Sequence, residues 1–430
     1  MPTDDSSRSA RTIPPESAAA VGAFVHIVGD AFAALGRELI AIRPTPARAL
    51  FATQAMLSVG LAVALAYAFH LSNIWWAAIS GFAVMQSKFS ACAQRGVQRV
   101  VGTVAGAIIG AVAGAMIGDV PWIFVPFLGV IVGVSVYRAL VSDAGYAWVL
   151  GAVTALMVTF EAHRLVSAAA TASFALLRVA EVVVGTVACV AVSALFHAGV
   201  QHYRKSRGAP PVPRAQAAST VDRVDGVNAQ AVTVIPSDAA QAVQALDATH
   251  IARAEQIALA MRKRLAWQSA WSVMILASLA YTWNLSGFAQ AMVTAVAVLI
   301  LPASALGKPT HKPIAERMIQ RFIGCLLAGA VSLALLPLLG DNAFACMAAL
   351  CAGVWIGCHV QTGTQGASYV GRQFGIAFIM VFVQDHHWSS DPMPALMRLV
   401  GILGGIVVLS GVMALGAAWA ARRTSHVAMR

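Results

Sequence analysis

Long apolar runs with few charges are the feature of this sequence that most limits its fold. A helix of about 20 apolar residues crosses the hydrocarbon core of a bilayer. Residues 65–118 hold two such runs around a short basic and polar loop, and residues 279–340 repeat the plan. The repeated unit is therefore predicted to be a membrane helical hairpin, and the chain an all-α polytopic membrane protein.

Composition excludes a water-soluble fold. Hydrophobic residues make up 59% of the 430 residues and charged residues only 11%, whereas soluble domains carry about 25% charged residues. A soluble core of this length could not bury so many apolar side chains. The net charge of +11 would suggest nucleic acid in a soluble protein, but in a membrane protein basic residues mark the cytoplasmic side. We therefore expect a lipid bilayer, and no nucleic acid, as a partner.

Six apolar spans are predicted in each half of the chain. The first set lies at about residues 50–70, 73–90, 98–118, 121–138, 146–162 and 172–196. The second set lies at about residues 265–284, 287–303, 318–338, 342–358, 368–384 and 395–420. Several spans are short and rich in glycine, so we expect about ten to twelve transmembrane helices.

These spans divide the chain into five predicted segments. The ends are a cytoplasmic segment at residues 1–48, with a helix at the membrane interface, and a cytoplasmic tail at residues 422–430. Two transmembrane repeats cover residues 49–198 and 265–421, and a partly helical cytoplasmic linker at residues 199–264 joins them. Nearly all Lys and Arg fall in the predicted internal segments, which favours cytoplasmic termini and an even number of spans.

The two halves are predicted to be tandem repeats. Arg48 aligns with Arg262 and Tyr67 with Tyr281, each 214 positions apart. Farther along, Arg99 aligns with Arg321 and Arg178 with Arg398, 222 and 220 positions apart. An even number of spans in each half makes the repeats parallel, related by an axis along the membrane normal, which is a plan that secondary transporters use.

Arg178 and Glu181 form the most informative pair of charges. They lie in the sixth span, three residues apart and so on one helix face, and Glu181 is the only carboxylate well inside any span. Charges at this depth normally face a bundle interior or water. Arg178 would contact an anion and Glu181 would bind a proton, because desolvation favours the neutral carboxyl although Arg178 opposes it. The alternative is an ion pair that only neutralises charge. Gly401 stands at the equivalent place after Arg398, so only one half could hold this proton site.

Other basic residues could form an electropositive vestibule. Arg99 and Arg321 open the third span of each half. They are either anchors at the lipid headgroups or, with neighbouring lysines and Arg95, a surface that concentrates anions. The polar, glycine-rich stretch from Cys358 to Gln373 is predicted to be a cytoplasmic turn or part of a gate.

One glycine face is predicted to pack helices. Glycine recurs every fourth residue in the third span, at Gly102, Gly106, Gly110 and Gly114. Small residues on one face let helices approach closely in lipid. The sequence gives no sign of an enzyme, a cofactor or a metal centre, since it lacks a phosphate-binding GxxxxGK[ST] loop, a CxxC pair and a nucleophile with its base.

Several motifs resemble the fusaric acid resistance family, which includes the aromatic carboxylic acid exporters. They are Arg48-Ala49, Leu65-Ala66-Tyr67, Trp76, the RxxGTxxG run from Arg99 to Gly106 and the RxxExxxG run from Arg178 to Gly185. The first half matches well. The second half keeps a weaker copy, with Cys325 at the place of Thr103.

This resemblance implies a proton-driven exporter of aromatic or related organic acids in the bacterial inner membrane. Members are often partnered by a periplasmic adaptor and an outer-membrane channel, and the chain could also form a homo-oligomer. The residues expected to bind substrate are Arg178, Arg99, Arg321, Arg398, Trp76 and Tyr67. The plant aluminium-activated malate transporters are similar in their membrane part, so a passive anion channel is the alternative. A membrane scaffold without a substrate is the second alternative.

Overall fold

Helices account for the regular structure of this chain. The computed structural model describes residues 15–40, 45–165, 167–207, 237–283, 288–300, 311–340, 342–383 and 393–428. These residues form thirteen helices and no strand. The first seven are α1 (Pro15–Ile40), α2 (Pro46–Ala68), α3 (Ile74–Val84), α4 (Phe89–Ile117), α5 (Pro121–Ala139), α6 (Gly145–Leu165) and α7 (Ala168–Ser206). The others are α8 (Ser237–Trp283), α9 (Phe288–Leu299), α10 (His311–Leu339), α11 (Ala343–Gln361), α12 (Ser368–Phe382) and α13 (Met393–Ala428).

Eight of these helices are long and apolar enough to cross a membrane. They are α2, α4, α5, α6, α7, α10, α11 and α13, counted over the described residues. The prediction of a polytopic all-α membrane protein is thereby confirmed. Each of the twelve predicted spans overlaps one helix from α2 to α13.

The second span of each half is shorter than predicted. Helices α3 and α9 have only 11 and 12 residues, which at 1.5 Å per residue is about 17–18 Å. The hydrocarbon core of a bilayer is about 30 Å thick. Neither helix can cross it alone, so α3 and α9 each end within the bundle.

Some predicted loops are helical. Helix α4 begins at Phe89, so Arg95 is part of it and Lys88 stands just before it. Likewise α11 continues through His359 and α12 begins at Ser368, which leaves a loop of only residues 362–367 between them. Hydropathy marks where apolar surface begins, whereas Ala, Gln and Arg extend a helix beyond that point because they favour helical backbone.

The helix pairings of one half recur in the other. Helix α4 packs on α6 and α7, while α3 packs on α2 and α7. The equivalent pairs, α10 with α12 and α13 and α9 with α8 and α13, are also in contact. Contacts between the halves are matched as well, because α5 packs on α8 and α11 packs on α2.

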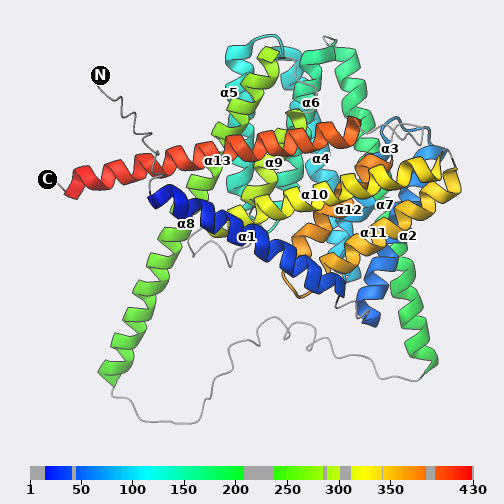
Figure 1. Ribbon diagram of the computed structural model, residues 1–430, viewed down its shortest axis with the longest axis horizontal. Helices are drawn as coiled ribbons and strands as arrows, with labels where there is room; N and C mark the ends of the chain where they lie inside the picture. The colour runs from blue at the N-terminus through cyan, green and yellow to red at the C-terminus, as the bar shows by residue number, and fades with distance from the viewer. Residues whose placement is uncertain are drawn as a thin grey trace, which may run out of the picture.

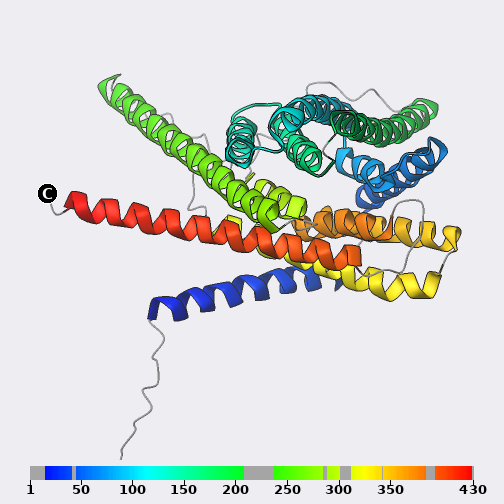
Figure 2. The same ribbon diagram turned by 90° about the horizontal axis from the view of Figure 1, so that it is seen from above.

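The two halves cross one another. Figure 1 shows α4, α5 and α6 running across the direction of α10 and α13, and in Figure 2 the first three are seen nearly end-on while α10 and α13 lie along the page. The halves meet through few helix pairs. Helix α1 packs on the second half, against α10 and α11.

Candidate functional site

Among the residues whose burial the structure describes, four arginines are buried inside the helical bundle. Arg99 and Arg178 belong to the first half and are each 3% exposed. Arg321 and Arg398 belong to the second half and are 4% and 6% exposed. A buried guanidinium is costly unless a counter-charge or a full set of hydrogen-bond acceptors surrounds it. The partners of these four residues therefore define the site.

Arg178 and Glu181 form an ion pair on one face of α7. The distance from Arg178 Nη1 to Glu181 Oε2 is 3.7 Å. Glu181 Oε1 also accepts a hydrogen bond from the backbone N–H of Asn73 at 3.0 Å, just before α3 begins. Both contacts stabilise a negatively charged carboxylate. Glu181 thus links α7 to the start of the short helix α3.

The guanidinium of Arg178 also contacts an aromatic ring and a thioether sulfur. It lies over the indole ring of Trp76, and its Nη2 donates to the sulfur of Met157 at 3.3 Å. A cation over an aromatic face is attracted by the ring quadrupole. Trp76, which was predicted to contact a substrate ring, therefore contacts Arg178. Tyr67 packs at the edge of the same core.

Arg99 binds neutral oxygen acceptors. Its Nε donates to Ser80 Oγ at 3.0 Å, and its Nη1 donates to the Tyr146 hydroxyl at 2.8 Å. Arg95 lies 4.1 Å from the centroid of the same tyrosine ring. Arg372 of α12 is close enough to Arg95 to interact with it by charge. Basic residues of both halves thus gather where α4, α6 and α12 begin.

Arg321 repeats one contact of Arg99, the hydrogen bond to a hydroxyl on the short helix. Its Nε donates to Thr294 Oγ1 at 3.2 Å and its Nη1 donates to Gln373 Oε1 at 2.7 Å. Thr294 lies 214 positions after Ser80, on the short helix α9 that matches α3. Each half therefore holds a buried arginine against a hydroxyl on its short helix.

Arg398 repeats the position of Arg178. Its guanidinium contacts the sulfur of Met380, as that of Arg178 contacts Met157. A matching close approach follows about two turns farther along the helix. A Cβ on Gly185 would overlap the carbonyl oxygen of Ala77. A Cβ on Gly405 would lie 2.6 Å from the carbonyl oxygen of Ala291.

The glycines of α4 face α6. A Cβ on Gly102 or Gly106 would overlap the backbone carbonyl of Ala147 or Gly151. Farther along, a Cβ on Gly110 would lie 2.7 Å from the Cβ of Val158, and one on Gly114 would overlap Ala162. This face brings α4 into backbone contact with α6 and so places Arg99 beside Tyr146.

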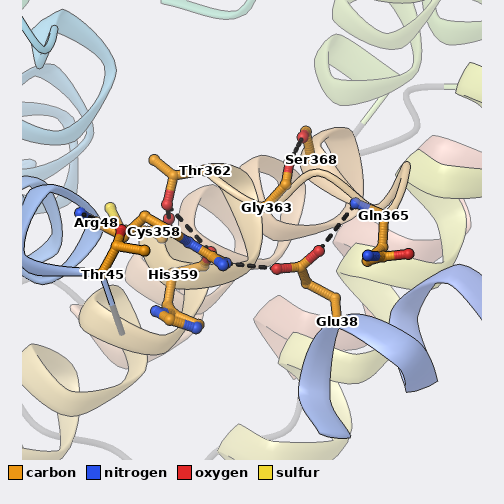
Figure 3. Close-up of polar contacts among 9 residues, drawn as sticks. All are labelled: Glu38, Thr45, Arg48, Cys358, His359, Thr362, Gly363, Gln365 and Ser368. Carbon is orange, nitrogen blue, oxygen red and sulfur yellow. Dashed lines mark hydrogen bonds and ion pairs between the residues drawn. The ribbon is translucent and has the colours of Figure 1, made fainter. Parts of the chain in front are cut away.

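A second polar cluster ties the N-terminal helix to the second half. Figure 3 shows Glu38 of α1 between Arg48 and the loop after α11. Arg48 Nη2 lies 2.5 Å from Glu38 Oε1 and donates to the His359 carbonyl at 2.6 Å. The backbone N–H of Gln365 donates to Glu38 Oε2 at 3.1 Å. This role of Glu38 was not predicted, although a charged residue in a mostly apolar helix was a signal for polar contacts.

The buried arginines and the apolar helices define a polytopic helical membrane protein with a positively charged interior. The model of the fusaric acid resistance protein family matches residues 48–209. The match covers the first half of the chain, from α2 to α7, and supports the resemblance seen in its motifs. No curated relative and no solved structure matched the chain.

Proposed function

We propose that this protein exports small organic anions, aromatic carboxylic acids in particular, across the bacterial inner membrane. One observation supports it most: four arginines are buried in the bundle, and among the described residues only Glu181 forms an ion pair with any of them. An excess of buried positive charge is stabilised by an anion. An export function also agrees with the family of the first half.

The residues divide between the two parts of such a substrate. The carboxylate is bound by buried arginines, since a guanidinium fork matches a carboxylate in geometry and charge. The aromatic ring packs on apolar and aromatic side chains of the core to which Trp76 and Tyr67 belong. The protein acts without catalysing a reaction, and a periplasmic adaptor and outer-membrane channel would carry the anion onward.

Proton coupling is the part of the proposal that depends on Glu181. This carboxylate is fully buried, and its protonation would release Arg178 and the start of α3 together. A proton would thereby change the charge of the site and the position of a short helix. Export driven by a pH gradient follows from this coupling.

The test is transport into inverted membrane vesicles with a panel of aromatic acids, with and without a proton gradient. We expect uptake that depends on the gradient, and we expect Glu181→Gln to abolish the gradient-driven part. Glu161→Gln is the matched control, because Glu161 pairs with Arg164 near the end of α6 and away from the buried arginines. Unchanged gradient-driven uptake in Glu181→Gln would refute the proton site.

A passive anion channel is the second candidate. The contacts of Glu181 with Arg178 and with the Asn73 N–H stabilise its ionised form, and a channel needs no protonation step. In that case Glu181→Gln would keep an electrodiffusive anion current in planar bilayers. A membrane scaffold would show neither uptake nor current with any acid of the panel.

A further inference from the structure

The two halves bury matching arginines but neutralise them differently. In the first half Arg178 pairs with Glu181. In the second half the equivalent arginine is Arg398, and the residue three positions later is Gly401, which has no side chain and is buried. Two contacts correspond, namely the methionine sulfur and the glycine packed on the short helix. The Trp76 ring beside Arg178 has no aromatic counterpart, because Gln290 stands 214 positions later.

Arg398 lacks a counter-charge among the described residues. Its Nε is buried and has no hydrogen-bond acceptor there, and none of the ion pairs formed by described residues includes it. It contacts the sulfur of Met380 and lies beside Cys325. A guanidinium has five N–H donors, so this one keeps donors for a ligand.

Arg321 adds a second positive charge nearby. It is close enough to Arg398 for the two guanidinium groups to repel one another. Its own partners, Thr294 Oγ1 and Gln373 Oε1, are neutral. Two buried cations with no carboxylate from the described part of the chain beside them are a costly arrangement for a protein by itself. An anion between the helices of the second half removes that cost.

We infer that the carboxylate of a small organic anion binds Arg398, in the place that the Glu181 carboxylate takes beside Arg178. This inference rests on the proposed function and assigns its substrate site to the second half. Glu181 acts as a tethered carboxylate that fills the corresponding site of the first half. Each chain therefore binds one anion, and a monocarboxylate is the matching class.

The experiment uses the full-length protein in lipid nanodiscs with benzoate as the probe, measured by calorimetric titration at neutral pH. Benzamide is the neutral control ligand. The wild type is expected to bind one benzoate per chain and no benzamide. Arg398→Gln should weaken benzoate binding at least about tenfold, the loss typical of one charge-assisted hydrogen bond. Arg164→Gln, a surface variant, should bind as the wild type does.

Gly401→Glu tests the same idea while keeping every arginine. It places a tethered carboxylate three residues after Arg398, as in the first half, and should exclude benzoate. Gly401→Gln is the matched neutral variant and should bind benzoate more tightly than Gly401→Glu does. This pair separates an effect of charge from an effect of size.

Several outcomes would overturn the inference. They are wild-type affinity in both Arg398→Gln and Gly401→Glu, or two benzoates per chain. Equal losses in the Glu and Gln variants, with Arg398→Gln unaffected, would also overturn it. The proposed function would survive these results if vesicle uptake of the wild type continued. A wild type that neither binds nor transports any acid of the panel would instead refute the proposed function itself.

Discussion

Glu181 takes part in two interactions, one within α7 and one with the residue just before α3. Its Oε2 faces Arg178 on its own helix, and its Oε1 accepts the backbone N–H of Asn73 before α3. Removing one partner of a buried ion pair leaves the other charge uncompensated, which costs about 3–5 kcal/mol. Loss of the Glu181 carboxylate should therefore lower the stability of the protein as well as its transport activity.

Small carboxylates should rescue a variant that lacks this side chain. In Glu181→Ala, Arg178 loses its carboxylate partner and so resembles Arg398 of the second half. The substitution also leaves space where the Glu181 carboxylate was. We expect a lower thermal unfolding temperature, and we expect formate to raise it more in the variant than in the wild type. Chloride at equal ionic strength is the control. An equal response of both proteins to formate would contradict this account of Glu181.

At the scale of whole helices, the glycine face of α4 fixes how closely α4 and α6 approach. The methyl group of Gly106→Ala would overlap the Gly151 carbonyl, so the helices must separate. Overpacking of this kind costs about 1–3 kcal/mol. We expect a lower unfolding temperature for Gly106→Ala in detergent. Gly411→Ala on α13 is the control, since nothing lies within 4 Å of a Cβ there; equal stability of the two variants would count against close packing.

The positions of most helices were predictable from the sequence. Hydropathy located every helix from α2 to α13, because a helix that faces lipid needs a long run of apolar residues. The N-terminal end of α4 and the C-terminal end of α11 were not predictable in this way, since both helices continue into polar residues. The partners of the arginines were also beyond reach. Ser80 and Tyr146 meet Arg99 only because α3 and α6 are its neighbours, and sequence spacing within one helix carries no information on that. Arg178 with Glu181 was found because both lie on α7.

At the scale of the molecule, the two halves join through few helix pairs, and α1 adds a further attachment. Helix α1 packs on α10 and α11, and Glu38 on it binds both Arg48 of α2 and the loop before α12. It therefore connects the first half to the second through one buried carboxylate, which is 1% exposed. This arrangement predicts that the loop depends on Glu38 for its order.

Hydrogen exchange measured by mass spectrometry would test this dependence. In Glu38→Ala the N–H of Gln365 loses its acceptor, so exchange in residues 362–367 should rise by at least about tenfold, the change expected for about 1.4 kcal/mol of lost protection. Glu38→Gln keeps a neutral acceptor for Gln365 but loses the charge that Arg48 faces, so its effect should be intermediate. Asp30→Asn is the control, because Asp30 pairs with His26 on the exposed face of α1. Exchange in α4 should stay unchanged in all three variants, since that helix packs on α6 and α7. Unaltered exchange at residues 362–367 in Glu38→Ala would mean that the loop is ordered by α11 and α12 alone.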